Sequence, residues 1–326
     1  MLGRGGLLGR NVESALAERG ACWHPCGRFS WDNPYVIESE LSAACKAFAV
    51  RVRESPWQIA WCAGTGSVGS STAALEQETS AFAYLLSCVK EFLCGLDAAP
   101  GAMFLASSVG GLYAGAQPSP FSEASPVAPL APYGWNKLEQ ESLARQWSLG
   151  TGTPLFIGRL SNLYGPGQNL QKGQGLISQI CLRLLAREPL ALYVPLDTIR
   201  DYLFARDAGR LVADGLARLR FEASLSSAPP AVVKILASQQ TATVATLLAQ
   251  FRWITKRPVS VIVAASPNAD RQARDLRTTS SVWPELDRYP VTTLSEGIRS
   301  VLTRVLEVAG EGNLQREASG SVDGSR

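Results

Sequence analysis

The sequence has little histidine, little charge and no long apolar run. Its 326 residues include 1 histidine, and 18% of them are charged. No apolar stretch is long enough for a transmembrane helix, and the amino terminus lacks the basic and then apolar pattern of a signal peptide. We therefore expect a cytoplasmic protein without a membrane partner.

The charge that is present is balanced and scattered. The formal net charge is +3, and the arginines form no stripe of the kind that binds nucleic acid. Hydrophobic residues make up 46% of the chain, as in ordinary globular proteins. We expect no nucleic-acid partner, and the length fits one large α/β domain with a smaller appended lobe.

The cysteines are odd in number and lack the regular spacing of a disulfide framework, which fits reduced thiols. Cys22 and Cys26 flank His24, a combination of residue types that occurs in metal sites. No second pair of ligands follows at zinc spacing, so we predict no metal site and interpret this segment as packing.

A short apolar run ends in two hydroxyl groups. Residues 103–106 read Met-Phe-Leu-Ala and lead into Ser107 and Ser108. The pattern predicts a buried strand that delivers both serines to the carboxyl edge of an open α/β sheet, where ligands bind. Successive side chains of a strand point to opposite faces, so we favour Ser108 over Ser107 for the site.

Tyr133 and Lys137 follow a Pro-rich loop and lie one turn apart on the same face of an expected helix. A free phenol has a pKa of about 10, so it is a poor base at neutral pH. A neighbouring ammonium lowers this pKa because it favours phenolate. Ser108 could then hold a substrate oxygen while Tyr133 moves its proton during hydride transfer.

Together, the paired serines, the Pro-rich loop and Tyr-x-x-x-Lys closely resemble the extended short-chain dehydrogenase/reductase family, in its NAD-dependent epimerase/dehydratase branch. The resemblance runs from Gly3 to about Leu306. It implies an α/β fold with a Rossmann-like, doubly wound parallel sheet and a smaller C-terminal substrate lobe. We expect residues 1–155 to form mainly the NAD(P)-binding domain. Residues 156–309 would form mainly the substrate lobe, with segments that return to the first domain, and the polar residues 310–326 a disordered tail.

The resemblance also implies a cofactor loop. Gly3, Gly6 and Gly9 have the spacing that lets a backbone approach a pyrophosphate at the start of a helix. The family has an apolar strand before the first glycine, whereas only Met1 and Leu2 precede it here. We expect this first strand, which belongs in the middle of the sheet, to be truncated because the native start lies upstream of Met1. The alternative is poor cofactor binding.

The segments that follow bear on the choice between NAD and NADP. We expect Ala21 to His24 as a second strand, and Arg28 rather than an acid follows it, which favours NADP slightly over NAD. The resemblance places Ala63 and Gly64, at the end of an expected third strand, beside the cofactor. It also implies that Tyr133 and Lys137 contact the nicotinamide end, with Lys137 reaching the ribose.

The second half of the chain carries the substrate residues that the resemblance implies. Asn162 belongs to an Arg-x-x-Asn-x-Tyr-Gly-Pro signature and would contact the substrate. Arg200 would donate to a diphosphate oxygen of a nucleotide sugar. Arg271 and Arg274 both qualify as the late arginine that grips the nucleotide phosphate, and the sequence does not choose between them.

The two residues after Ser108 indicate which reactions of the family to expect. Val109 and Gly110 stand where the family's sugar-nucleotide dehydratases carry an Asp-Glu pair. We therefore predict an NAD(P)-dependent nucleotide-sugar epimerase or ketoreductase that works through Ser108, Tyr133 and Lys137. The alternative is a non-catalytic dinucleotide-binding scaffold or regulator on the same fold. The family expectation for assembly is a homodimer.

Overall fold

The structure is a computed structural model of the chain. It describes residues 1–22, 24, 26–53, 55–64, 66, 69–94, 101–170, 173–226, 228–265, 273–289 and 291–320, with side chains to residue 310.

The largest sheet consists of four parallel strands. In spatial order they are β1 (Trp57–Trp61), β2 (Gly101–Ser108), β3 (Leu155–Leu160) and β7 (Ala231–Leu236). The two central strands, β2 and β3, are almost entirely buried, because helices cover both faces of the sheet. All strand pairs run parallel, so the ends that carry Ser108 and Leu160 meet at one edge.

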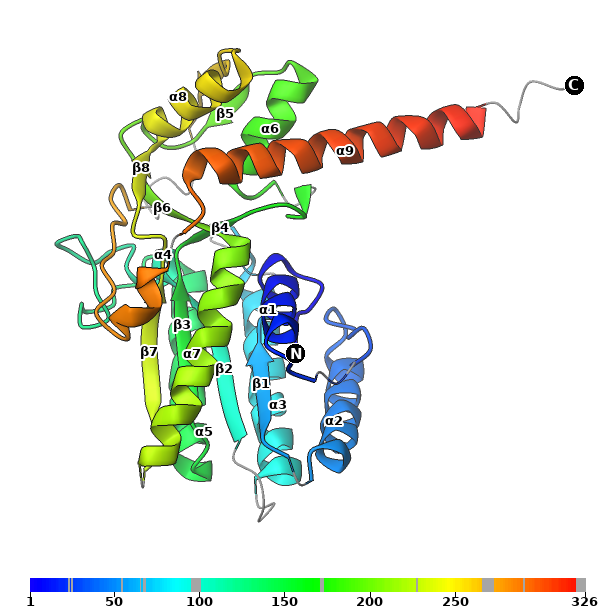
Figure 1. Cartoon of the computed structure of the whole chain (residues 1–326), viewed down its shortest axis with the longest axis vertical. Coiled ribbons are helices and arrows are strands. Elements are labelled where there is room, and N and C mark those ends of the chain that lie inside the picture. The colour runs from blue at the N-terminus through cyan, green and yellow to red at the C-terminus, as the bar shows by residue number, and fades with distance from the viewer. Residues whose placement is uncertain are drawn as a thin grey trace, which may run out of the picture.

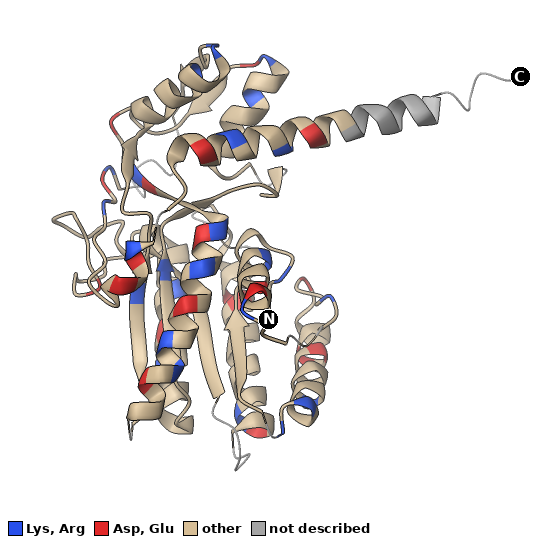
Figure 2. Cartoon of the chain, in the orientation of Figure 1, with Lys and Arg blue, Asp and Glu red and all other residues tan. Residues whose placement is uncertain are grey.

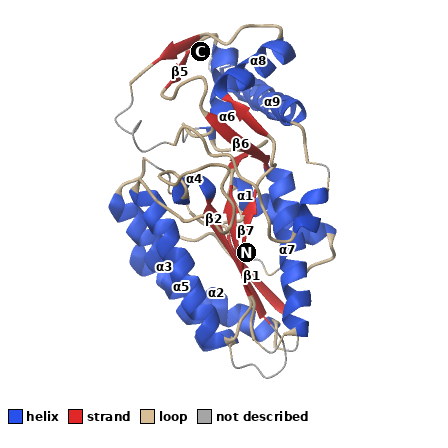
Figure 3. Cartoon of the chain, turned by 90° about the vertical axis from the view of Figure 1, so that its left-hand side faces the viewer, coloured by secondary structure: helices blue, strands red, loops and turns tan. Residues whose placement is uncertain are grey.

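Helices form a layer on each face of this sheet (Figure 3). One layer contains α1 (Leu7–Glu18) and α7 (Ala205–Leu225), which pack against each other and against Phe156 of β3. The other contains α2 (Pro34–Arg51), α3 (Thr72–Leu93) and α5 (Pro132–Thr151). The expected doubly wound α/β architecture is therefore present.

Local signals explain where the helices of the second layer begin and end. The Ser71 side chain accepts a hydrogen bond from the Ala74 N–H and so caps α3. Pro132 occupies the first turn of α5, where a missing N–H costs nothing, and Gly152 ends the helix in the left-handed conformation.

The sheet is incomplete on the side of β1. Leu2 forms a single parallel bridge to Trp61, in which its N–H bonds to the Ala60 carbonyl and its own carbonyl accepts from Cys62, each at 2.9 Å. The first strand is thus reduced to Leu2, as the sequence suggested. The strand expected from Ala21 to His24 was wrong at the described positions 21, 22 and 24, because the Ala21 N–H bonds to the Leu16 carbonyl at 3.1 Å and so belongs to the end of α1. A cavity of about 520 Å³ lies beside β1, lined by Leu2, Ile59, Leu85 and Leu216 among others.

A second, smaller body of structure lies above the carboxyl edge of the main sheet (Figure 1). It contains the three-stranded sheet β4 (Asn162–Tyr164), β6 (Ile199–Phe204) and β8 (Thr241–Thr243), and the pair β5 (Leu190–Leu192) and β9 (Val261–Val263). Helices α6 (Leu176–Ala186), α8 (Val244–Thr255) and α9 (Leu294–Gly320) pack on these strands around a separate apolar core. Two short helices, α4 (Val109–Leu112) and η3 (Pro284–Arg288), complete the elements.

The carboxyl-terminal helix is longer than the sequence suggested. We expected a disordered tail over residues 310–326, whereas α9 continues to Gly320 and extends away from the body (Figure 1). Residues 321–326 lie outside the described part of the chain.

Basic and acidic residues are intermingled over the surface, for example along α7 (Figure 2). Within the described residues, no helix combines the length and the apolar character needed to cross a bilayer.

Candidate active site

A cavity of about 1240 Å³ lies where β1, β2 and β3 end, between the main sheet and the smaller body above it. Parallel strands bring their carboxyl ends to this edge, which is the usual place for ligands in open α/β sheets. Most of the residues that the sequence singled out line this cavity: Gly3, Gly6, Ala63, Gly64, Ser108, Tyr133, Lys137, Asn162 and Arg200.

The predicted catalytic residues lie together on one wall. Tyr133 and Lys137 share a face of α5, and the Lys137 ammonium lies 5.9 Å from the centre of the Tyr133 ring. Ser108 ends β2 and caps α4, because its hydroxyl accepts a hydrogen bond from the Gly111 N–H at 3.1 Å. Tyr133 and Ser108 are only half-buried, so both can be reached from the cavity.

Ser107 is occupied by a different contact. Its buried hydroxyl donates to the Glu141 carboxylate at 2.7 Å, and Glu141 in turn accepts two hydrogen bonds from Arg159, at 2.9 and 2.7 Å. Arg159 also donates to the Tyr113 hydroxyl at 2.6 Å. Burial disfavours the charge on Arg159, but the bonds to Glu141 hold its pKa above the ordinary value. This network joins β2, β3 and α5 and makes Arg159 an ion-pair residue.

Lys137 has a partner that sequence reasoning missed. Its ammonium donates to Glu78 of α3 at 2.8 Å and to Gln140 at 3.0 Å. Burial penalises both charges, yet the pairing raises the pKa of Lys137 and lowers the pKa of Glu78. Glu78 lies on α3, and no local pattern in the sequence indicates that it meets a lysine 59 residues away.

The glycine loop, residues 3–9, packs closely against the backbone of neighbouring residues. Gly3 has a φ of +82°, and a side chain there would place its Cβ 2.4 Å from the Ala63 nitrogen. A Cβ on the buried Gly9 would lie 2.2 Å from the Gly3 carbonyl oxygen. The helix α1 starts directly after this loop, and its N-cap, Gly6, supplies no side chain to the free N–H groups. An uncapped helix start beside a cavity is suited to a phosphate, so these residues fit the phosphates of a dinucleotide.

The segment between α1 and α2 does not bring the predicted residue, Arg28, to the cavity. Arg28 is exposed and is not among the residues that line the cavity, whereas Trp31 and Asp32 are. Asp32 lies next to the start of α2. The Asn33 side chain caps this helix, because it accepts hydrogen bonds from the Tyr35 and Val36 N–H groups. The structure therefore brings an acid, and not the arginine, to the predicted cofactor side. We expected the residue that selects the cofactor at the end of a strand from Ala21 to His24, and no strand lies at the described positions 21, 22 and 24.

The predicted substrate residues divide into two groups. Asn162 and Arg200 line the cavity, with Asn162 donating to the Asp201 carbonyl at 3.1 Å. The Arg200 guanidinium donates to the carbonyls of Ile199 and Ala273, and burial lowers its pKa. Arg274 instead pairs with Asp197 at the surface and is absent from the described cavity wall, so the structure does not support its predicted role. Arg271 lies outside the described residues.

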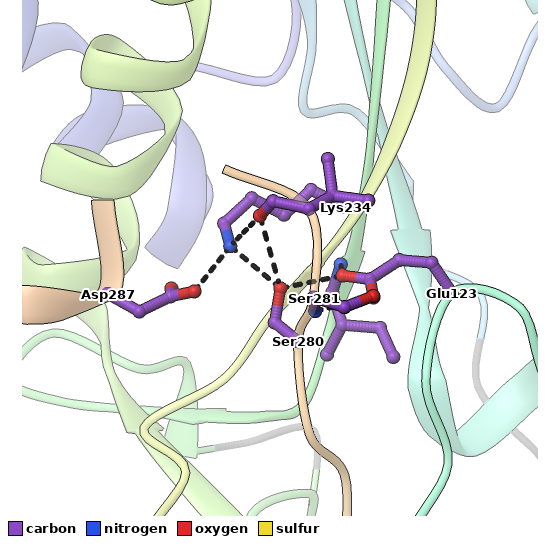
Figure 4. Close-up of polar contacts among 7 residues, drawn as sticks. Glu123, Lys234, Ser280, Ser281 and Asp287 are labelled. Carbon is purple, nitrogen blue, oxygen red and sulfur yellow. Dashed lines mark hydrogen bonds and ion pairs between the residues drawn. The ribbon is translucent and has the colours of Figure 1, made fainter. Parts of the chain in front are cut away.

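Glu123, in the Pro-rich loop, belongs to a separate polar cluster (Figure 4). Its carboxylate accepts from the Ile235 N–H at 2.8 Å and the Ser280 hydroxyl at 2.6 Å. The fully buried Lys234 donates to Ser280 at 2.7 Å and to Asp287 at 2.6 Å. This cluster fixes the loop to β7 and lies apart from the residues that line the large cavity.

A family model described as the NAD dependent epimerase/dehydratase family matches residues 1–220. Two curated relatives match shorter segments. The dTDP-L-rhamnose 4-epimerase of Burkholderia thailandensis is 42% identical over 92 residues, which are 28% of this chain and 25% of that protein. The dTDP-glucose 4,6-dehydratase of Neisseria gonorrhoeae is 37% identical over 90 residues, again 28% and 25%. The matched segments thus span about a quarter of these relatives.

Solved structures match over nearly the whole chain. UDP-glucose 4-epimerase of Thermotoga maritima, solved with UDP-glucose, has a TM-score of 0.75 at 19% identity and covers 94% of this chain and 98% of its own. UDP-glucuronic acid 4-epimerase of Bacillus cereus, solved with UDP-glucuronic acid and NAD, has a TM-score of 0.72 at 16% identity with the same coverage. RMD of Pseudomonas aeruginosa, solved with NADPH, has a TM-score of 0.70 at 19% identity and covers 93% of this chain and 96% of its own.

At these identities the structures establish the fold, while the family model spans most of the chain. The predicted fold class and the resemblance are therefore confirmed, and an NAD-type dinucleotide agrees with the description of the family and with the NAD or NADPH of the solved neighbours. The chain belongs to the NAD dependent epimerase/dehydratase family.

Proposed function

We propose that this protein is an NAD-dependent nucleotide-sugar epimerase or ketoreductase. The observation that carries the proposal is one cavity that is lined by the glycine loop, by Ser108, Tyr133 and Lys137, and by Asn162 and Arg200 of the smaller body. A cofactor and an anionic substrate could meet there beside a proton-transfer group.

Each catalytic residue has a role in this proposal. Ser108 holds the reacting sugar oxygen, and Tyr133 accepts the proton of a sugar hydroxyl or returns it to a keto oxygen. Lys137 places a positive charge beside the phenol ring and reaches the ribose of the dinucleotide. Acceptance of the hydride is the chemistry that a bound nicotinamide supplies.

The geometry favours NAD over NADP, which reverses the slight preference that Arg28 gave in the sequence. Asp32 is exposed but lines the cavity, and an acid near the adenosine ribose accepts bonds from its hydroxyls and repels a 2′-phosphate. Arg28, the side chain that would attract such a phosphate, is exposed and absent from the lining.

The residues that follow Ser108 on this wall argue against a dehydratase reaction. Ser108 is followed by the buried Val109 and by Gly110, which lines the cavity, so no carboxylate stands directly after the hydroxyl. An epimerase or ketoreductase needs only Ser108, Tyr133 and Lys137 to hold and exchange protons.

The experiment is a thermal melt of the protein with NAD, then NADP, and then a panel of UDP-, GDP- and dTDP-sugars with the better dinucleotide present. A ligand at a hundred times its dissociation constant stabilises the folded state by about 2.7 kcal/mol, which is a visible shift. A larger shift with NAD than with NADP and a further shift with one sugar nucleotide would support the proposal and select a substrate for turnover assays. A cooperative melt that no dinucleotide moves would contradict it and favour a non-catalytic scaffold.

A further inference from the structure

The buried carboxylate of Asp201 joins the smaller body to the main sheet, and Asp201 is absent from the described cavity wall. We propose that Asp201 is a positioning residue that holds Asn162 and Arg200 in place for the sugar nucleotide. This inference rests on the proposed function, in which Asn162 and Arg200 bind the substrate. It goes beyond that function because it assigns a role to a residue that does not line the cavity.

The chain passes from the main sheet to the smaller body at two places beside Asp201. After β3 ends, Ser161 leads directly into β4. After β7 ends, residues 237–240 lead into β8. Asp201 belongs to β6, which lies between β4 and β8 in the smaller sheet. Its position is therefore next to both crossings of the chain.

The Asp201 carboxylate bonds to both crossings, and we call this set of contacts the junction. One oxygen accepts from the Ser161 hydroxyl at 2.6 Å and from the Ser238 N–H at 2.9 Å. The other oxygen accepts from the Ser238 hydroxyl at 2.8 Å. Asp201 is 1% exposed, and burial raises the pKa of its carboxyl although these bonds oppose the shift. Separating a crossing from β6 would take donors away from a buried carboxylate, which is costly.

The two predicted substrate residues are direct neighbours of the junction. Asn162 follows Ser161, and its amide donates to the Asp201 carbonyl at 3.1 Å. Arg200 precedes Asp201 on β6, and successive side chains of a strand point to opposite faces. Arg200 thus lines the cavity while the Asp201 carboxylate bonds to the crossings. The junction therefore fixes both substrate residues through the backbone.

The Arg200 side chain has separate contacts that orient its guanidinium. It donates to the Ile199 carbonyl at 2.8 Å and to the Ala273 carbonyl at 2.7 Å. Both acceptors are neutral, and a diphosphate would supply a negative charge that these carbonyls lack. Loss of the junction should move the strand that carries Arg200, and with it the donor that the proposed function assigns to the diphosphate.

The predicted cofactor residues lie on other segments. The glycine loop and Asp32 come from the amino-terminal part of the chain, and Lys137 lies on α5. The junction contacts involve none of these segments. Loss of the junction should therefore weaken the binding of the sugar nucleotide and leave the binding of NAD nearly unchanged. A general loss of stability would not produce this split, because it acts on both ligands alike.

The test measures two dissociation constants by titration calorimetry, one for NAD and one for a sugar nucleotide with NAD in excess. The probes are UDP-glucose, GDP-glucose and dTDP-glucose, and the one that the wild type binds most tightly is used for the variants. In Asp201→Ala the dissociation constant of the sugar nucleotide should rise about tenfold or more, because small displacements of positioning groups have large effects. The dissociation constant of NAD should change less than about twofold, as for independent sites.

Two further variants test the junction with smaller changes. Ser161→Ala keeps the carboxylate and removes one of its bonds, so it remains informative if Asp201→Ala does not fold. Its dissociation constant for the sugar nucleotide should rise about two- to tenfold. Asp201→Asn keeps the oxygen that accepts from Ser161 and from the Ser238 N–H, and the Ser238 hydroxyl can turn to the Gln240 carbonyl, 3.2 Å away. This variant should therefore bind the sugar nucleotide almost as the wild type does.

Ser148→Ala is the matched control for Ser161→Ala. The buried Ser148 hydroxyl donates to the Thr153 carbonyl at 2.6 Å, before the start of β3 and away from the junction. Its loss also removes one short hydroxyl bond and should lower the melting temperature. Both dissociation constants should stay at their wild-type values.

The possible outcomes separate this inference from the proposed function. Wild-type affinity for the sugar nucleotide in Ser161→Ala, or an equal loss of affinity for NAD and the sugar nucleotide, would overturn the inference and leave the proposed function in place. A wild-type protein that binds NAD but none of the three sugar nucleotides would remove the substrate role of Asn162 and Arg200, and the inference with it. A wild-type protein that binds no dinucleotide would refute the proposed function itself.

Discussion

The two walls of the large cavity are held in different ways. The wall formed by β2, β3 and α5 is fixed by buried side chains that carry charge, above all Glu141 with Arg159. The wall formed by the amino terminus is fixed by backbone contacts, in which Gly3 approaches Ala63 and Leu2 makes one bridge to β1. The proposed proton-transfer residues thus lie on a wall fixed by buried charges, whereas the predicted cofactor loop depends on a few close contacts.

This difference predicts opposite sensitivities. On the charged wall, a change that leaves a buried charge alone should reduce the free energy of unfolding severely. On the wall fixed by backbone contacts, which we call the backbone wall, one added side-chain carbon should be enough to reduce the free energy of unfolding. Changing an exposed charge there should alter that free energy little. Substitutions on the two walls test this difference.

The largest effect is expected at Glu141, which is 1% exposed. Glu141→Gln leaves the buried Arg159 without a countercharge, which typically costs about 3–5 kcal/mol of unfolding free energy. Urea denaturation measures this, and the exposed neighbour on α5 provides the control: Glu139→Gln should change stability by less than about 0.5 kcal/mol. Equal effects of the two variants would show that the buried pair is not what holds this wall.

On the same wall, Tyr133→Phe tests chemistry rather than stability. The ring and its packing stay, and only the hydroxyl is lost. We expect turnover, once the melting assay has identified a sugar nucleotide, to fall by about a hundredfold or more, because proton transfer by a positioned side chain contributes on that order. The melting temperature should stay close to that of the wild type. Full turnover in this variant would remove Tyr133 from the mechanism.

On the backbone wall, Gly9→Ala should act through steric crowding. Its Cβ would lie 2.2 Å from the Gly3 carbonyl oxygen, so the loop must shift. We expect a loss of about 1–3 kcal/mol in unfolding free energy, as for other overpacked sites, together with loss of the melting shift caused by NAD. Gly150→Ala is the matched control, since nothing lies within 4 Å of a Cβ there, and an alanine in that helix should be neutral or stabilising. A Gly9→Ala protein that still responds fully to NAD would separate this loop from cofactor binding.

The contrast also explains what the sequence could predict. Strands such as β2 and β3 are short apolar runs, and the Tyr133 to Lys137 spacing places both side chains on one helical face, so local patterns were sufficient. Local patterns fail for contacts between distant segments. The pairing of Glu78 with Lys137 joins two helices, and Arg274, one of two arginines that qualified for the nucleotide phosphate, pairs with Asp197 instead. The strand expected at Ala21 failed at the described positions 21, 22 and 24, where the Ala21 N–H bonds to the Leu16 carbonyl at the end of α1.

The smallest of these effects, and the one that decides the cofactor, is expected at Asp32. Asp32→Asn keeps the size of the side chain and removes the charge that disfavours a 2′-phosphate, so the preference for NAD over NADP should fall about tenfold, which is about 1.4 kcal/mol. Dissociation constants for the two dinucleotides, measured by titration calorimetry, give this ratio. The control is Arg28→Ala, which should leave the ratio unchanged because Arg28 lies outside the cavity lining. If Arg28→Ala weakens NADP while Asp32→Asn changes nothing, the loop between α1 and α2 must rearrange when the cofactor binds, and the backbone wall would be more adaptable than its close contacts indicate.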